Sequence, residues 1–547
     1  MKARLRGAMG AYLTVAVLVA SILAGRSAPL AAAELKNGGT MTVAYKNEMS
    51  SLDPAIGYDG ASWNLIRAVF DGLMGYKVGT TDLTPGLAES YSVSEDGLTY
   101  TFKLRAGVKF HNGRALTAED ARYAIDRVVD PKTKSPGQQF FASIAGFDER
   151  AKGSSDRIAG VRAIDDRTLE IKLAHPDASF LHIMAMNFSY PVPREEVEKA
   201  GADFGKHPVG TGAFKVADWR PGQQLVLERN ADYWQSGLPH LDKVVVNVGI
   251  EPLTAFLQFQ RGEVDVLGDG IPTAKFNEVV NDPAMKDQVI TGPRLRADYI
   301  TMKTTMKPFD DKRVRQAVNH AINKARLVQL ISGRAVATNQ ILPPLMAGYD
   351  KDYEGYAYDP QKAKALLAEA GYPDGFSSEL FATTTDPDPR IAQALQQDLA
   401  AVGIKVELRT LAPAQVRAAA AKPDGAPMLW AGVMGWGADY PDPSDFFTPI
   451  LSCASRGAWN WADYCSPAAD TKAAEANALA DPAREAERIA RWKEVYRMVM
   501  DDAPWVPVYN DKRVILRSKR LAGPEGAFVA PVLPLIDYPQ VYVTDAK

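Results

Sequence analysis

The segment best suited to chemistry is residues 435–443, which reads Gly-Trp-Gly-Ala-Asp-Tyr-Pro-Asp-Pro and follows the apolar run 427–434. Asp439 lies three residues after Trp436, at the end of a predicted strand, where proline and glycine end regular pairing. A carboxylate beside a flat aromatic ring suits a bound cation. Because glycines flank the tryptophan, the backbone has little side-chain cover and another chain can pair with it. The alternative is a proline-rich turn with solvated carboxylates.

No catalytic or metal-binding motif stands out elsewhere in the sequence. The six histidines are scattered, and none has HExxH or another metal-ligand spacing. There is no GxSxG elbow or Walker loop, and Gly210-Thr211-Gly212 lacks the third glycine and the helix of a nucleotide loop. We therefore expect no catalytic residue, no metal and no cofactor. A glycosidase-like pair among the many carboxylates stays open as an alternative.

The first 33 residues have the features of a secretory signal peptide. Lys2, Arg4 and Arg6 precede an apolar run over residues 8–24, and small residues up to Ala33 form a cleavage site. We expect cleavage near Ala33 and a periplasmic protein. A membrane anchor is the alternative, although small residues dilute the apolar run.

The rest of the chain is long and mildly acidic. The formal net charge of the 547 residues is −3, and removing the four basic residues of the signal peptide leaves −7. This charge disfavours nucleic acid and anionic membrane as partners. The length predicts about two to four domains.

The only two cysteines are Cys453 and Cys465. In an oxidising compartment we predict a disulfide between them, which closes a short loop and stiffens the segment after residues 435–443. Two free thiols are the alternative.

Strands and helices alternate as in an α/β protein. A period of two and β-branched runs predict strands, and apolar residues spaced by 3.6 predict helices. The predicted strands are 40–46, 98–104, 168–173, 224–229, 243–248, 404–408, 427–437 and 505–509, and the predicted helices include 62–73, 117–129 and 311–331. Three more helices begin at Asp-Pro pairs, at Asp359, Asp388 and Asp481, and two of these end at Gly371 and Gly403.

Two of these strands carry further expectations. The continuous β-branched run 243–248 predicts a strand buried on both faces. The strand 427–437, expected to close the last sheet, should be buried as far as Gly437. Its carboxyl end is where open α/β sheets bind ligands.

An ordered series of motifs resembles one known family. The motifs are Leu52-Asp-Pro54, Pro85-Gly-Leu-Ala-Glu-Ser90, Gly107-Val-Lys-Phe-His-Asn-Gly113, Gly210-Thr-Gly-Ala-Phe214, Arg229-Asn-Ala-Asp-Tyr-Trp234, Gly262-Glu-Val-Asp265, Pro308-Phe-Asp-Asp-Lys-Arg-Val-Arg-Gln-Ala317, Ala368-Glu-Ala-Gly-Tyr372 and residues 436–443. Together they resemble the family 5 extracellular solute-binding proteins of ABC importers, the group that contains oligopeptide-, dipeptide-, glutathione- and nickel-binding proteins. The resemblance covers essentially the whole chain after the signal peptide.

The resemblance implies an α/β, periplasmic-binding-protein-like fold of the three-lobed, cluster C type. Two main lobes are joined by a two-segment hinge, near residues 298–300 and 508–512, and an extra lobe packs beside them. Lobe I would comprise residues 34–76, 202–296 and 510–547, lobe II residues 77–201, and lobe III, which closes over the ligand, residues 297–509.

The resemblance also implies site residues. Asp439 matches the residue that holds the α-ammonium of a peptide ligand, and Gly435 and Gly437 belong to the strand that pairs with the peptide backbone. Arg390 matches an arginine that binds the ligand carboxylate. Two structural alternatives stay open, with Asp439 capping the next turn and Arg390 lying on the surface of a first helical turn.

Two aromatic side chains of the segment, Trp436 and Tyr440, are expected to line the cleft. Aromatic rings at such spacing also pack in protein cores, which is the alternative for both.

The predicted function is that of a periplasmic substrate-binding protein of an ABC importer. It would capture a peptide or peptide-like solute between its lobes, close by population shift, and deliver the solute to the ABC permease and ATPase of the inner membrane. We expect a monomer and not an enzyme. One alternative keeps the fold but binds a non-peptide solute such as an opine, a sugar or a metal chelate, and another is an exported hydrolase.

Overall fold

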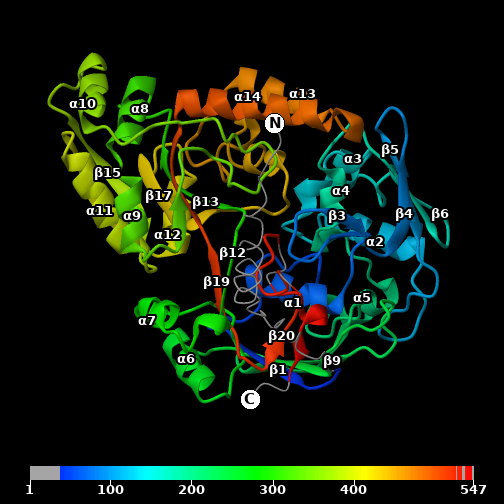
Figure 1. Ribbon diagram of the computed structural model, residues 1–547. Coiled ribbons are helices and arrows are strands. Elements are labelled where there is room, and N and C mark those ends of the chain that lie inside the picture. Colours follow the sequence, from blue (N-terminus) through cyan, green and yellow to red (C-terminus); the bar gives the residue numbers. More distant parts are fainter. Residues whose placement is uncertain (1–36, 525, 533–535, 545–547) are drawn as a thin grey trace, which may run out of the picture.

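The computed structural model describes residues 37–524, 526–532 and 536–544, so the predicted signal peptide lies outside the described residues. Their strands form three larger sheets and three two-stranded pairs (Figure 1). No helix in these ranges is both long and apolar enough to cross a membrane.

The first sheet, called here the N-terminal sheet, takes its strands from two distant parts of the chain. Its order is β11-β1-β10-β9-β8, with β11 (Val266–Leu267), β1 (Thr40–Ala44), β10 (Lys243–Asn247), β9 (Gln224–Arg229) and β8 (Phe214–Arg220). The first three strands are parallel and the last two are antiparallel to their neighbours. Helices α1 (Gly60–Val69) and α6 (Pro252–Gln260) pack beside β8 and β11.

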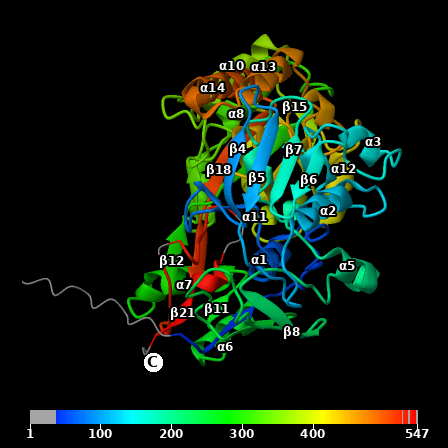
Figure 2. The same cartoon turned by 90° about the vertical axis from the view of Figure 1, so that its right-hand side faces the viewer.

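The second sheet is antiparallel, with the order β4-β5-β7-β6, and it faces the viewer in Figure 2. Its strands are β4 (Ala88–Val93), β5 (Thr99–Leu104), β7 (Thr168–Lys172) and β6 (Val161–Asp165), and the predicted alternation of β5 is confirmed because Tyr100, Phe102 and Leu104 are buried. Helix α2 (Ala118–Val129) packs on it, with Thr117 and Asp120 forming the N-terminal cap. Three short helices follow, α3 (Phe147–Ala151), α4 (Phe180–Ile183) and α5 (Arg194–Ala200).

The third sheet has six strands in the order β14-β18-β13-β17-β15-β16. Their bounds are β14 (Ala335–Ala337), β18 (Trp505–Asp511), β13 (Arg296–Met302), β17 (Met428–Gly437), β15 (Phe376–Thr383) and β16 (Ile404–Leu411). The core on one face includes α8 (Lys312–Ala321), α9 (Lys324–Leu330), α10 (Pro360–Glu369) and α11 (Asp388–Ala400). The core on the other face includes α12 (Pro413–Ala420), α13 (Pro467–Asn477) and α14 (Glu485–Asp502).

The chain passes twice between the N-terminal sheet and the six-stranded sheet. It leaves through β12 (Val289–Gly292) into β13 and returns from β18 into β19 (Arg513–Leu516), and β12 pairs with β19. Helix α7 (Phe276–Asn281) precedes the first crossing. The other strand pairs are β2 (Met74–Tyr76) with β3 (Leu83–Pro85) and β20 (Leu521–Ala522) with β21 (Tyr542–Val543). The tail then packs Ile536, Tyr538 and Val541 into the core that holds β1.

Two predicted elements differ from the structure because their partners are remote in sequence. The predicted helix 311–331 is two helices, since the chain breaks at Ile322 and the Asn323 side chain caps α9 by accepting from the Arg326 N–H. Because of this break, Ala325, which continues the 3.6-residue spacing of apolar residues from Val314, is exposed and does not face the core. In β10 only Val244 and Val246 are buried, so the prediction of burial on both faces is wrong: no described element fully covers the second face.

The three predicted Asp-Pro caps differ from one another in the structure. Asp359 caps α10 as predicted, by accepting from backbone N–H groups. Asp481 caps only the short 3-10 helix at residues 482–484, and α14 begins after it at Glu485. Asp388 is no cap, because it is fully buried and accepts from Thr383 and from the Trp430 indole of β17.

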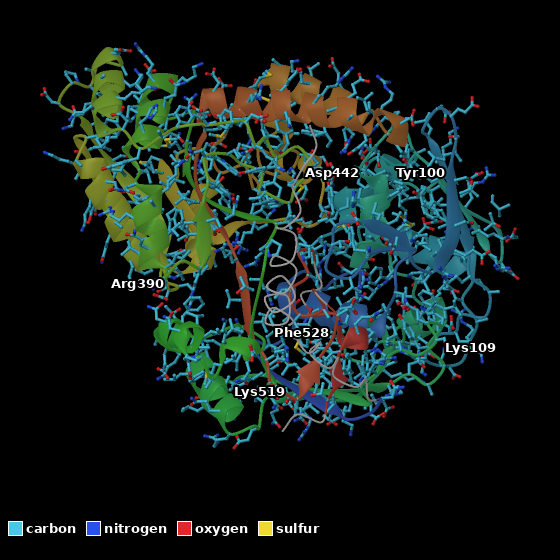
Figure 3. All side chains as sticks on the ribbon, viewed as in Figure 1. Tyr100, Lys109, Arg390, Asp442, Lys519 and Phe528 are labelled. Atoms are coloured by element: carbon cyan, nitrogen blue, oxygen red, sulfur yellow. A yellow bond between two sulfur atoms is a disulfide. The ribbon has the colours of Figure 1, made fainter. Side chains whose placement is uncertain are left out.

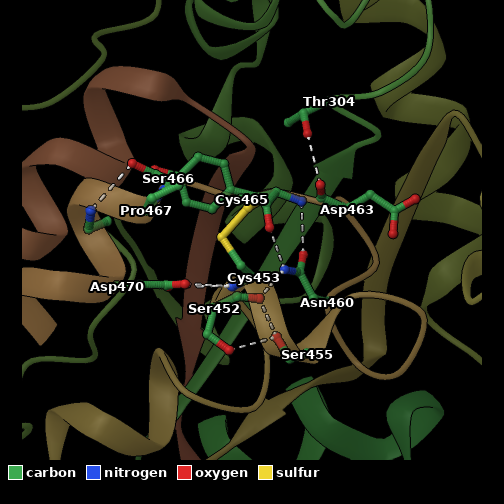
Figure 4. The surroundings of a disulfide bond; sticks show 12 residues. Thr304, Ser452, Cys453, Ser455, Asn460, Asp463, Cys465, Ser466, Pro467 and Asp470 are labelled. Atoms are coloured by element: carbon green, nitrogen blue, oxygen red, sulfur yellow. Dashed lines mark hydrogen bonds between the residues drawn. A yellow bond between two sulfur atoms is a disulfide. The ribbon is translucent and has the colours of Figure 1, made fainter. Parts of the chain in front are cut away.

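The predicted disulfide is present. Cys453 and Cys465 are bonded with their Cα atoms 4.4 Å apart (Figure 4). Around the bond, the Cys453 N–H donates to Asp470 at 3.2 Å, and the Asn460 amide donates to the Ser452 carbonyl at 3.0 Å. The crosslink therefore stabilises the segment that connects the end of β17 with α13.

Candidate functional site

Strand β17 organises the candidate site, and its two edges differ. On one edge it pairs with β13 as far as its end, where Trp436 lies opposite Ala297 and Gly437 opposite Arg296. On the other edge it pairs with β15 only at Met428 and Leu429. Beyond Leu429, this second edge has no strand neighbour among the described residues. The strand lies inside the sheet and does not close it as predicted, because β13 and β18 come from remote parts of the chain.

The two glycines that flank Trp436 in this strand are glycine for different reasons. A Cβ atom at Gly435 would lie 2.5 Å from the Ala297 carbonyl oxygen and 2.6 Å from Oδ1 of Asp298, so β13 leaves no room for a side chain. A Cβ atom at Gly437 would meet nothing within 4 Å. The strand is fully buried only as far as Gly432, so the predicted burial as far as Gly437 is wrong: its last part lies where β15 no longer covers it.

A cavity of about 780 Å³ lies beside the middle of β17 and the segment that follows β15. This volume is in the range of about 300–1,000 Å³ that holds small ligands. β17 contributes Gly432 and Val433, and the opposite wall comes from the N-terminal sheet, its neighbouring loops and the crossing strands. Ligand-sized space therefore lies beside β17, but residues 434–437 at its predicted carboxyl end do not line it.

Arg390 lines this cavity and already has partners. Its guanidinium is 3.0 Å from the Asp386 carboxylate, and both side chains are about half exposed. Figure 3 shows Arg390 at the edge of the helical layer that faces α6 and α7. An exposed pair of this kind contributes little to stability, so its arginine is free to exchange partners.

Asp439 does not line the large cavity. It borders a separate cavity of about 20 Å³ together with Arg67 and Asn187. Its Oδ2 accepts a hydrogen bond of 2.8 Å from the Tyr58 hydroxyl, which belongs to the loop before α1. Burial raises the pKa of Asp439 to about 7, and the Tyr58 hydrogen bond opposes that rise only in part. The carboxylate has no cationic partner within the described ranges. Because the cavity beside it has room for only about one water molecule, a ligand cation would have to displace the Tyr58 hydroxyl.

A second carboxylate, Asp445, lies behind Asp439. Its Oδ2 accepts from the Trp436 indole N–H and from the Asp439 backbone N–H, each at 3.1 Å. Asp445 is fully buried and its Oδ1 has no hydrogen-bond partner in the described structure. Burial and then the charge of Asp439 raise the pKa of Asp445 well above its ordinary value. The two carboxylates therefore disfavour ionisation of each other.

The two aromatic candidates take up different positions. Tyr440 is buried, and its ring lies 6.2 Å from that of Phe140 and 6.3 Å from that of His182, so it packs against the part of the chain that carries the four-stranded sheet. Trp436 is half-buried with its ring 6.2 Å from that of Trp459. Neither side chain lines the large cavity.

Asp442 has a structural role. It forms a buried ion pair with Arg488 of α14, and it accepts from the Ser444 N–H at 2.9 Å. Burial alone would raise the pKa of Asp442, but the Arg488 charge holds that pKa below its ordinary value.

The sequence analysis missed several residues of the site. Tyr58 is 381 residues from Asp439, and Arg513 of β19 lines the cavity far from β17 in sequence. Nothing local marks either of them, although an aromatic residue soon after Leu52-Asp53-Pro54 was a weak signal. No group of three or more His, Cys, Asp or Glu side chains within the described ranges is placed to hold a metal ion.

Comparisons with known proteins find relatives that match most of the chain. Residues 82–458 match the profile of bacterial extracellular solute-binding proteins, family 5. Heme-binding protein A of Haemophilus influenzae is 32% identical over 90% of this chain and 91% of its own length. Glutathione-binding protein GsiB of Escherichia coli O157:H7 is 31% identical over 88% and 91%. The ABC transporter-associated periplasmic binding protein DppA from Helicobacter pylori, in complex with peptide STSA, superposes with a TM-score of 0.78 at 28% identity, covering 93% of this chain and 99% of that one.

Proposed function

The chain belongs to family 5 of the bacterial extracellular solute-binding proteins, and we propose that it captures a peptide or peptide-like solute for an ABC importer. Delivery to the permease and ATPase of the inner membrane, a periplasmic location, cleavage near Ala33 and a monomeric state are parts of the same proposal. Relatives that bind peptide, glutathione and heme support binding as the activity.

The three larger sheets support a division into three lobes. The N-terminal sheet and the tail would form lobe I (34–76, 202–296 and 510–547), the four-stranded sheet lobe II (77–201), and the six-stranded sheet lobe III (297–509). The two crossings, β12 to β13 and β18 to β19, would be the hinge, because they are the paired segments that join lobes I and III. Rotation about them would open and close the ligand site.

The observation that carries the proposal is the contact between Tyr58 and Asp439. It joins lobe I to lobe III at a carboxylate that lacks a counter-ion in the described structure. A ligand α-ammonium placed there would replace a neutral hydroxyl by a cation, and such a charge-assisted bond is worth about 1.5–3 kcal/mol. The edge of β17 past Leu429, which has no strand neighbour in the described structure, would pair with the ligand backbone beyond Val433, whose N–H already donates to Asp388 at 3.1 Å.

Calorimetric titration tests the proposal. The peptide Ser-Thr-Ser-Ala and glutathione are titrated into the mature protein, each beside a form with an acetylated amino group. We expect one-to-one binding of at least one free amine and at least tenfold weaker binding of its acetylated form. Equal affinity for the free and the acetylated form would show that Asp439 does not bind the ligand ammonium. If neither peptide binds, the proposal that the ligand is a peptide is wrong.

Two alternatives are separated by the same samples. The 32% identity to a heme-binding protein favours hemin as the non-peptide ligand to titrate, and tight hemin binding without peptide binding would replace the peptide proposal. A hydrolase would instead release fragments of the peptides over time, which mass spectrometry of the titrated samples detects.

A further inference from the structure

The large cavity has an unusual wall on the side of the hinge, where positive charge exceeds the negative charge available to pair with it. Its basic side chains are Arg294, Arg296, Arg334, Arg390, Lys512 and Arg513. The acidic side chains of the same wall are mostly committed to other donors. Asp59 caps α1, Glu48 accepts from Trp219 and Gly222, and Asp388 accepts from Thr383 and Trp430.

Two of the remaining carboxylates are shared between two arginines, and the third, Asp269, accepts from the Lys46 backbone N–H at 2.6 Å. Arg294 is 2.8 Å from Asp511, and Arg296 is 3.0 Å from Asp298 and 3.9 Å from Asp511. Arg296 also donates to the Gly432 carbonyl at 2.5 Å, which ties the hinge to β17. Arg294 and Arg296 therefore form ion pairs with both acidic side chains of the hinge, Asp298 and Asp511.

Arg513 is therefore left without an ion pair in the described structure. It is half-buried at the start of β19, and its guanidinium has no hydrogen bond or ion pair within the described ranges, where its backbone pairs with Gly292. Burial and then the charge of Arg294 lower the pKa of Arg513 to about 10. A guanidinium removed from water beside a second guanidinium is unfavourable unless an anion joins them.

Arg334 adds charge from the facing lobe. Its guanidinium lies 4.0 Å above the Phe276 ring of α7 and donates at 3.4 Å to the Ile271 carbonyl, but it has no carboxylate partner among the described residues. The cavity is thus bordered by uncompensated arginines from both sides of the hinge.

We infer that Arg513, with Arg294 beside it and Arg334 lining the same cavity, forms an anion subsite for a carboxylate or phosphate group of the bound solute. The inference rests on the proposed function and names the class of solute, one that carries an anionic group at the hinge side of the cavity. Arg guanidinium groups suit this task because their planar donors match the oxygens of both anions.

A merely structural role for Arg513 predicts a different result, because a hinge arginine that only packs does not respond to added anions. Thermal unfolding of the mature protein in sodium phosphate or succinate, against sodium chloride of equal ionic strength, tests this with no organic ligand. Arg513→Gln removes the charge, and Lys109→Gln is the control, with the same charge change at an exposed position near the four-stranded sheet, far from the cavity (Figure 3).

We expect phosphate or succinate to raise the Tm of the wild type and of Lys109→Gln, and at least a tenfold higher anion concentration to be needed for Arg513→Gln. Whichever anion is the more effective identifies the ligand group. An equal anion response in Arg513→Gln and the wild type overturns the subsite. Arg513→Lys, which keeps the charge but loses the planar fork, should lie between the two and serves if the glutamine variant fails to fold.

A peptide arm separates this inference from the proposed function. Ser-Thr-Ser-Ala with a free carboxylate is compared with its C-terminal amide, and the preference for the acid should fall at least tenfold in Arg513→Gln. If anions stabilise the protein but the peptide does not bind, the anion subsite is supported and the peptide is rejected as the ligand. If the peptide binds but Arg513→Gln still prefers the free carboxylate over the amide as strongly as the wild type does, the anion subsite is rejected and the proposed function stands.

Discussion

Replacing Asp439 with Asn should strengthen the unliganded fold and weaken ligand binding, and this opposite pair of signs tests the proposed anchor. The substitution keeps the shape of the side chain and an oxygen that accepts from Tyr58. It removes a carboxylate that burial leaves without a counter-ion in the described structure. A purely structural carboxylate, such as a turn cap, would instead lose stability when neutralised.

The size of the effect follows from the pKa. An aspartic acid with a pKa of about 7 in the folded protein and 3.8 otherwise costs up to about 2 kcal/mol at pH 5 and about 4 kcal/mol at pH 8. Because the folded pKa is the higher one, the cost is absent below a pH of about 4 and grows as the pH rises through both values. Asp439→Asn should recover this energy, whereas it should weaken binding of a ligand ammonium about tenfold or more.

Urea unfolding of wild type and Asp439→Asn at pH 5 and pH 8 measures the stability, and calorimetric titration with Ser-Thr-Ser-Ala and its N-acetylated form measures the binding. The variant should be more stable than the wild type, with the larger gain at pH 8. Asp470→Asn is a suitable control, since burial also raises the pKa of Asp470 although this residue lines neither the large cavity nor the small one beside Asp439. A variant less stable than the wild type at pH 8 would refute the reasoning about the uncompensated charge.

Three further substitutions test the surroundings. Tyr58→Phe removes the hydrogen bond from lobe I to Asp439, and small-angle scattering of the unliganded protein should show a larger radius of gyration because fewer molecules are closed. Gly435→Ala places a Cβ atom 2.5 Å from a backbone oxygen, so thermal unfolding should show a loss of about 1–3 kcal/mol. Asp442→Asn leaves the buried charge of Arg488 without its main partner, and urea unfolding should show a loss of about 3 kcal/mol or more.

The parts of the fold that the sequence predicts are those with local signals. Helix α2 carries its own cap at Thr117, and β5 alternates along its length, so both were predicted within a residue or two. Asp359 and Asp388 show where this stops, because the same Asp-Pro pair caps one helix and in the other turns inward to bind β17. The difference depends on Trp430, which is 42 residues from Asp388.

The residues of the site likewise divide into those with a local signal in the sequence and those without one. Residues 435–443 marked Asp439 as a candidate because carboxylate, tryptophan and glycine are adjacent in sequence. Tyr58 and Arg513 lay beyond prediction, since the first meets Asp439 and the second meets the cavity only through folding of segments several hundred residues apart. What a charge can bind depends on which partners it lacks, and that is a property of the folded chain.

In the proposed function, Asp439 and Arg513 together disfavour closure of the lobes when no solute is bound. Each is an ionisable group removed from water, of opposite sign, without an oppositely charged partner in the described structure. In the proposal both gain one from a solute that carries an amine and an anion. The two charges that bind the solute therefore also make closure without it unfavourable. A population shift requires that the solute bind the closed form more tightly than the open form, and the same two contacts supply that difference in affinity. A solute lacking either charge would leave one penalty in place and close the lobes less completely.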